Sequence, residues 1–199
     1  MWNIFACVSG KYKNDKKWED LASWGKDLGV TSWSKDIVCM DTIHPKLFMG
    51  SRLSAQAILD KNKLSDQYKY SYKGSCFHTL CIASDSTCKY CEVSSKFKKY
   101  DLQDVDHQDE VFLSTAINTA KKVRKLLRRG RKVLVHCHTG RNRSALVILV
   151  YCARYTNMTY EQSLHEIRRL NSSRFPMQST LQNGSFTSAV RRNWEKLRK

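Results

Sequence analysis

The segment KVLVHCHTGRNRSALVILVY, residues 132–151, constrains the fold more than any other part of the chain. Lys132–His136 is a short apolar run that suits a buried strand, and Ala145–Tyr155 is an apolar stretch that suits a helix. A polar loop containing Gly140 joins the two. A strand that passes through such a loop into a helix indicates an α/β fold.

The chain from residue 41 onwards alternates in the same way. Thr159 and Gln162 have capping-box spacing at the start of one helix. The pattern predicts strands at Lys46–Gly50, Phe77–Ala83 and Lys96–Leu102, an acidic loop at Asp104–Glu110, and helices at Ser54–Leu59, Val111–Arg129, Thr159–Leu170 and Asn183–Lys199. We therefore expect one domain over residues 41–199, with a central, mostly parallel sheet flanked by helices.

Residues 1–40 have a different texture, since they carry four of the five tryptophans. Asp15–Leu28 has apolar residues at near-helical spacing, which predicts a short amphipathic helix. This extension is expected to pack on the domain or to contact a partner, including a second copy of the chain.

The sequence has no apolar run of the roughly 20 residues that a membrane span requires, and it has no recognisable signal peptide. Its eight cysteines are therefore expected to be reduced thiols, which places the protein in the cytoplasm or the nucleus.

The formal net charge of +17 is unevenly distributed. Eight of the twelve residues from Lys121 to Lys132 are basic, and a second basic cluster closes the chain at Arg191–Lys199. Such surfaces attract anionic partners, among them RNA, acidic proteins and phosphorylated substrates, although a solvated basic surface gives the same pattern.

The loop after the strand has the chemistry of an anion site. Its backbone N–H groups gather at a helix N-terminus, and the planar guanidinium of Arg143 matches two phosphate oxygens. Cys137 lies at the base of the loop, where the helix dipole and Arg143 favour the thiolate. A thiolate in that position can attack phosphorus and form a phosphocysteine.

The pattern His136-Cys137-x5-Arg143-Ser144 resembles the signature of the cysteine-based protein phosphatases. The resemblance implies that Cys137 is the nucleophile, that His136 orients the loop and that Ser144 assists breakdown of the phosphoenzyme. The implied phosphate-binding residues are His138, Thr139, Gly140, Arg141, Asn142 and Arg143. It implies no metal cofactor.

Further segments resemble the dual-specificity phosphatases, of the small atypical or poxvirus-like type, over roughly residues 41–198. They are Ile43–Ser51 with Ala55, Phe77–Ser84, Arg174-Phe175-Pro176 and Asn183–Phe186. In that family the general-acid Asp stands about as far before the nucleophile as Asp106, 31 residues before Cys137. Asp104 and Asp109 share the loop and are the alternatives.

The implied activity is hydrolysis of phosphotyrosine, phosphoserine and phosphothreonine in proteins. The basic or potentially basic loop residues His138 and Arg141 also suit phosphoinositide phosphatases. Asn142 before the Arg also resembles RNA 5′-triphosphatases, so both remain alternatives. A non-catalytic phosphate-binding module is the alternative of another class, but its usual mark is loss of the Cys, Arg or Asp.

A second cluster has the residue types of a zinc site. Its members are Cys76, His78, Cys81, Cys88 and Cys91. Cys88 and Cys91 have ligand spacing, but the strand alternation expected over Phe77–Ala83 turns its side chains to opposite faces. Ordinary reduced cysteines are the preferred interpretation.

Overall fold

The computed structural model describes residues 37–55, 78–82, 97–100, 102–104 and 109–199. Several predictions lie wholly or partly outside these ranges. Among them are the helices at Asp15–Leu28 and Ser54–Leu59, the acidic loop at Asp104–Glu110 with Asp106, and Cys76, Cys88 and Cys91 of the zinc-type cluster.

The described strands form one five-stranded sheet. Its order is β1 (Ile37–Cys39), β2 (Leu47–Gly50), β5 (Val133–His136), β3 (His78–Cys81) and β4 (Phe97–Lys99). β1 runs antiparallel to β2, and the remaining neighbours are parallel. The expected central, mostly parallel sheet is therefore confirmed, with the strand that precedes Cys137 at its centre.

The strand β1 has no counterpart among the predicted elements. It pairs with β2 so that Ile37 lies opposite Gly50. The sheet thus begins before residue 41. The sequence did not predict this edge strand, because a run of only three residues gives little periodic signal. The division into an extension and a domain stays a prediction.

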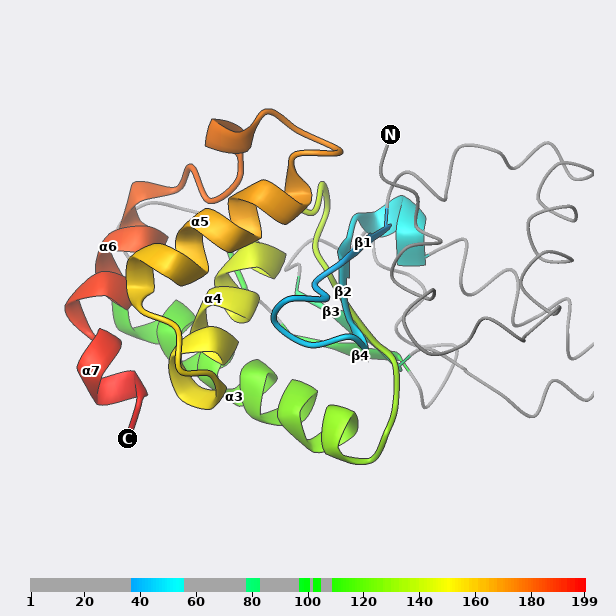
Figure 1. The fold of residues 1–199 in the computed structure, drawn as a ribbon, viewed down its shortest axis with the longest axis horizontal. Coiled ribbons are helices and arrows are strands. Elements are labelled where there is room, and N and C mark those ends of the chain that lie inside the picture. Colours follow the sequence, from blue (N-terminus) through cyan, green and yellow to red (C-terminus); the bar gives the residue numbers. More distant parts are fainter. Residues whose placement is uncertain (1–36, 56–77, 83–96, 101, 105–108) are drawn as a thin grey trace, which may run out of the picture.

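The helices α3 to α7 lie together on one side of the sheet (Figure 1). They are α3 (Asp109–Arg128), α4 (Arg143–Tyr155), α5 (Tyr160–Asn171), α6 (Gly184–Arg192) and α7 (Trp194–Leu197), with a 3-10 turn at Met177–Ser179. α4 is the central helix, and its residues from Ser144 to Ala153 are all buried. Its sequence is apolar on every side because α3, α5, α6 and α7 surround it.

The closing helix differs from its prediction. Asn183–Lys199 is divided into α6 and α7 at Asn193, whose side-chain amide donates to the carbonyl of Ala189 at 3.0 Å. A side chain that bonds to the preceding turn competes with the helical pattern, so the backbone leaves it at φ −103°. Asn183 does start the helix, since its side-chain oxygen accepts from Phe186 N.

For the other predicted strands and helices whose ends the structure describes, the bounds agree to within a few residues. The capping box of Thr159 and Gln162 at the start of α5 is confirmed. α4 begins at Arg143 rather than Ala145, so Arg143 and Ser144 belong to its first turn. Among the described residues, no helix is both long enough and apolar enough to cross a membrane.

The described cysteines are of two kinds. Cys81, Cys137 and Cys152 are free, whereas Cys39 in β1 is disulfide-bonded, so the expectation of reduced thiols throughout fails at Cys39. His78 and Cys81 are three residues apart in β3 and therefore point to opposite faces of the sheet. No group of three or more potential metal ligands occurs within the described ranges.

Candidate active site

The loop of residues 137–142 lies at the carboxyl end of the central strand β5 and leads directly into α4. Gly50 of β2 and Cys81 of β3 flank His136, the last residue of β5. In open parallel sheets ligands bind at the carboxyl ends of the strands. The predicted residues His136, Cys137 and Arg143 are thus brought together at the end of the sheet where a site is expected.

The carbonyl groups of the loop are held by the surrounding scaffold. Four successive carbonyls accept hydrogen bonds from donors in separate segments. The donor–acceptor pairs are Arg52 N–His138 O (3.0 Å), Arg174 Nη2–Thr139 O (3.0 Å), Asn171 Nδ2–Gly140 O (3.4 Å) and Leu181 N–Arg141 O (3.2 Å). These bonds fix the carbonyl oxygens toward the protein and hold the curve of the loop.

The amide groups of the loop have the opposite character. In the described part of the chain, Gly140 N donates to Cys137 Sγ at 3.2 Å, and no other amide from residue 138 to residue 143 has an acceptor. Five N–H donors at a helix N-terminus, with no acidic residue in the first turn of α4, make a site for an oxyanion.

Gly140 is required for two reasons. Its φ of 77° lies in the left-handed region that side chains disfavour. A Cβ atom at this position would also lie 2.6 Å from the carbonyl oxygen of Gly50. The loop can therefore curl against β2 only with glycine here.

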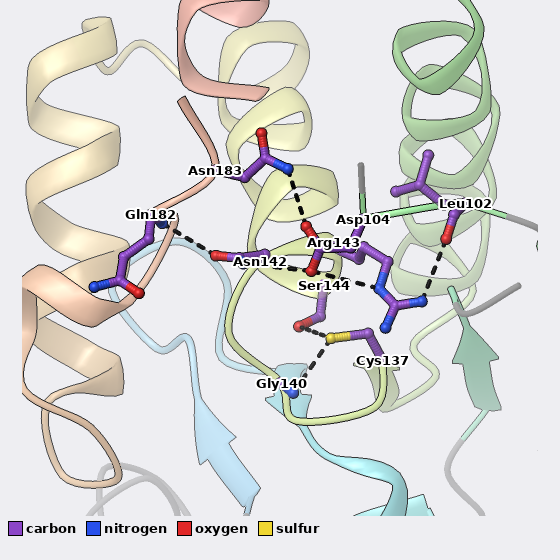
Figure 2. Close-up of polar contacts among 9 residues, drawn as sticks. All are labelled: Leu102, Asp104, Cys137, Gly140, Asn142, Arg143, Ser144, Gln182 and Asn183. Carbon is purple, nitrogen blue, oxygen red and sulfur yellow. Dashed lines mark hydrogen bonds and ion pairs between the residues drawn. The ribbon is translucent and has the colours of Figure 1, made fainter. Parts of the chain in front are cut away.

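Cys137 is 2% exposed, and its sulfur has two polar neighbours. These are the Gly140 amide and Ser144 Oγ, which is 3.5 Å from the sulfur (Figure 2). The sulfur is thus held in place at the base of the loop by the Gly140 amide and lies beside the Ser144 hydroxyl. A second cysteine, Cys152 in the middle of α4, is fully buried in the core, and this burial raises its pKa to about 12.

His136 is buried behind the loop, at 1% exposure. Its Nδ1 lies 3.4 Å from the carbonyl oxygen of Cys137. The ring thus contacts the backbone of the nucleophile, and its role in orienting the loop stays a prediction.

The guanidinium of Arg143 is held on the side of the loop that faces residues 102–104. Its Nη1 donates to the carbonyl of Leu102 at 3.3 Å, and its Nε lies 3.9 Å from Asp104 Oδ2 (Figure 2). Only 11% of the Arg143 side chain is exposed. A largely buried cation in contact with a carboxylate is oriented as well as charged.

Asp104 is the centre of a small polar network. Oδ1 accepts from Asn183 Nδ2 at 3.0 Å, and Oδ2 accepts from Asn142 Nδ2 at 3.3 Å. Asn142 in turn accepts from Gln182 N at 3.0 Å (Figure 2). The network joins the segment before α3, the loop and the start of α6. Sequence reasoning missed this role of Asn183, although it had marked Asn183–Phe186 as a family segment.

The side chain of Arg141 contacts the segment before α6, while its main-chain amide is one of the five loop donors without an acceptor among the described residues. The role of Arg141 in phosphate binding stays a prediction. Its Nε donates to Ser179 O at 3.1 Å and its Nη2 to Gln182 Oε1 at 2.8 Å. The guanidiniums of Arg141 and Arg174 both lie over the ring of Phe175, at 5.3 and 4.9 Å. The Phe that interrupts the family's Arg-Pro pair thus packs against both cations.

The structure describes some of the remaining predicted residues but not all of them. His138 and Thr139 are exposed at the surface of the loop. Asp109 is the first residue of α3, and Asp106 lies outside the described residues.

The chain has clear relatives in sequence. The family model for the dual specificity phosphatase catalytic domain matches residues 61–190, more than half of the chain. Protein phosphatase Slingshot homolog 3 of Mus musculus is 27% identical over 130 residues, which is 64% of this chain and 18% of that protein. The chain therefore spans less than a fifth of the length of this relative.

Solved structures share the fold. Human DUSP28 superposes with a TM-score of 0.58 at 17% identity, covering 82% of this chain and 96% of that one. OH1 from the Orf virus, described as a tyrosine phosphatase with triple substrate specificity, gives a TM-score of 0.50 at 21% identity, covering 72% of this chain and 79% of that one.

Proposed function

Because the chain belongs to the dual specificity phosphatase catalytic domain family, we propose that it hydrolyses phosphomonoesters on proteins through Cys137. The observation that carries this proposal is the position of the Cys137 sulfur. It accepts from the Gly140 amide and has Ser144 Oγ nearby, within a loop whose carbonyls are tied to the scaffold.

In the first step, the Cys137 thiolate attacks the phosphorus atom, an S–P bond forms and the P–O ester bond breaks. The loop amides and the guanidinium of Arg143 hold the equatorial oxygens, where charge develops. We assign the proton for the leaving oxygen to Asp106 on the strength of its spacing from Cys137.

In the second step, water attacks the phosphorus of the phosphocysteine, and Asp106 takes its proton. The S–P bond breaks and the electron pair returns to sulfur as a thiolate. Ser144 Oγ, 3.5 Å from the sulfur, is placed to donate a hydrogen bond to that thiolate as it leaves. Inorganic phosphate and the starting enzyme result.

Asp104 has a different role in this scheme. Both of its oxygens accept hydrogen bonds from asparagine side chains, and the carboxylate lies beside Arg143. We propose that Asp104 is a positioning residue that orients the guanidinium of Arg143.

Substitution of the nucleophile tests the proposal. Cys137→Ser should abolish turnover of para-nitrophenyl phosphate, because a serine hydroxyl in this loop has no base to ionise it. Binding of a phosphotyrosyl peptide, measured by calorimetry, should persist because the amides and Arg143 remain. Cys152→Ser is the matched control and should keep its activity; turnover by Cys137→Ser at the wild-type rate would refute the mechanism.

The substrate class needs a direct comparison. Rates on a phosphotyrosyl peptide, a phosphoseryl peptide, triphosphate-ended RNA and a phosphoinositide separate a protein phosphatase from the two alternatives. The bonds from Arg141 to Ser179 and Gln182 favour protein substrates, since that cation is already occupied.

We also propose that the enzyme works in the cytoplasm or the nucleus. The free thiol of Cys137 supports this proposal, because a catalytic thiolate requires a reducing compartment. The disulfide at Cys39 does not support it, because disulfides persist mainly in oxidising compartments. Fractionation of cells that express the tagged protein tests it.

A further inference from the structure

The chain contains a long segment without any carboxylate. Between Glu110 and Glu161 there is no Asp or Glu, whereas the same segment holds eleven Lys or Arg residues. Eight of these eleven lie between Lys121 and Lys132, at the end of α3 and in the turn that follows it. The positive charge is thus concentrated at one place in the fold.

Part of this charge forms a stripe along the solvent side of α3. We call it the α3 stripe, and its members are Lys121, Lys125, Arg128, Arg129 and Arg131, all of them exposed. The first four follow the spacing i, i+4, i+7 and i+8, which places them on one helical face. The opposite face, with Ala120, Val123 and Leu127, is buried in the core.

The cations of the α3 stripe are uncompensated. Within the described part of the chain, none of these five side chains forms an ion pair or a hydrogen bond. Other exposed arginines do: Arg169 pairs with Glu166 at 2.6 Å and Arg191 with Glu161 at 3.1 Å. Like charges on one helical face repel each other, so the stripe destabilises the folded protein when no partner is bound. An anionic partner would relieve this repulsion.

The stripe lies away from the candidate active site. The end of α3 precedes β5, while the catalytic loop follows it, so the two are at opposite ends of that strand. In Figure 1 the end of α3 is at the bottom of the view, and the chain rises through β5 to the loop. At 3.3 Å per residue, the four residues of β5 alone separate them by about 13 Å. The stripe therefore does not bind the phosphoryl group that is hydrolysed.

The chemistry of the stripe selects among anionic partners. Helices that bind membrane surfaces place apolar side chains beside their cations. Among the described residues the exposed large apolar side chains are Leu53 and Val111. Val111 stands ten residues before Lys121, which is about 15 Å along the helix. The stripe also has no aromatic side chain on which an unpaired base would stack, as single-strand binding requires.

We propose that the α3 stripe is a docking site for the phosphate backbone of double-stranded nucleic acid. A duplex presents one negative charge per roughly 1.7 Å of its axis, and cations spaced three to four residues apart along a helix can meet successive phosphates. The contacts are to phosphates alone, so binding is independent of base sequence. The site recruits the domain to a polyanion and takes no part in hydrolysis.

The test compares two variants that lose the same number of charges. The first carries Lys121→Gln, Lys125→Gln and Arg128→Gln; the control carries Lys196→Gln, Arg198→Gln and Lys199→Gln at the basic C-terminus. Binding of a fluorescent 20-base-pair RNA duplex, a DNA duplex of the same length, a single strand and phosphatidylserine vesicles is measured at several salt concentrations.

The stripe variant should bind both duplexes roughly 10- to 100-fold more weakly than wild type and lower the slope of log K against log salt by about 3, since each phosphate contact contributes about 0.9. The control should bind nearly as wild type does. Both variants should hydrolyse para-nitrophenyl phosphate at the wild-type rate. A third variant, Lys121→Arg with Lys125→Arg, should retain binding.

Three results would overturn the proposal. One is an equal loss of binding by the control, which would show that net charge alone is at work. Another is tighter binding to the single strand or to the vesicles than to either duplex. The third is an unchanged salt slope in the stripe variant, provided that its melting temperature matches that of wild type.

Discussion

At the scale of single residues, Asp104 and Asp106 stand two positions apart but have different assigned tasks. Asp104 has a complete set of partners, since its two oxygens accept from Asn183 and Asn142 and it lies beside Arg143. A carboxylate that two amide donors and a guanidinium hold in place suits an anchor better than a mobile proton donor.

Asp106→Asn and Asp104→Asn should therefore fail in different ways. Loss of the acid at Asp106 should slow phenyl phosphate by roughly 10²- to 10³-fold, and should slow a substrate with a good leaving group much less. Loss of the anchor at Asp104 should lower kcat/KM about tenfold for both substrates, mainly through KM. Steady-state kinetics with the two leaving groups checks both variants.

The pH profile gives the second readout. In the Asp104→Asn variant the basic limb assigned to the general acid should remain, and in Asp106→Asn it should disappear. The reverse pattern, with leaving-group dependence at Asp104 alone, would exchange the two roles.

At the scale of elements, α5 is fastened to the turn before β2 by Glu166. Oε1 accepts from Thr42 Oγ1 at 2.5 Å, and Arg169 donates to both carboxylate oxygens at 2.6 and 2.7 Å. The hydrogen bond from Arg169 holds the pKa of the Glu166 carboxyl below its ordinary value, against the opposing effect of burial. The charged form is therefore favoured in the folded state.

Glu166→Gln should make stability depend less on pH. A carboxyl with a lowered pKa in the folded state contributes stability above the ordinary value of 4.5, and loses it as pH falls through the folded value. We expect the free energy of unfolding of the variant to be about 1 kcal/mol lower than that of wild type at pH 7. This difference should disappear as the pH falls below the folded-state pKa of Glu166.

Urea unfolding at several pH values measures this difference. Glu161→Gln is the matched control, because its pair with Arg191 is 66% and 70% exposed and should be worth little at any pH. A pH-independent difference between wild type and Glu166→Gln would contradict the assignment.

The sequence predicted some elements better than others, for physical reasons. The strand, loop and helix around Cys137 are a local pattern, so residues 132–155 alone determine them. The Asp104–Asn183 bond joins residues 79 positions apart, and no local pattern encodes it. The division at Asn193 was missed because the apolar spacing continues through Trp194 and Leu197, both of which are buried.

At the scale of the whole molecule, the active site is a place where oxyanion binding and folding are coupled. The loop amides reach their positions only in the folded state, so a tetrahedral oxyanion binds the native protein and not the unfolded chain. The dependence on the folded state also explains why the sequence did not predict the contacts of the Arg141 side chain. Its contacts with Ser179 and Gln182 depend on how the segment before α6 packs on the loop.

Tungstate should therefore raise the melting temperature. At 100 times its Kd, a ligand of the native state adds about 2.7 kcal/mol, which for a domain of this size is roughly 5–10 °C. Arg143→Met should lose most of this shift, whereas Arg141→Met should keep it because its side chain faces residues 175–182. Thermal unfolding by fluorescence is the measurement, and an equal shift in the Arg143 variant would exclude the loop as the site of binding.

The four bonds that hold the loop carbonyls have a genetic consequence. Two of their donors, Arg52 and Leu181, are main-chain amides, and the other two, Asn171 and Arg174, are side chains more than 30 residues from the carbonyls that they bind. Substitution of Asn171 or Arg174 would remove a side-chain donor without removing an apolar side chain from the core, and would let the amides around Cys137 rotate. Such alleles would be conditional: the protein accumulates at every temperature, and activity disappears on warming. Mutations that abolish activity would thus be found at positions that do not contact the phosphate.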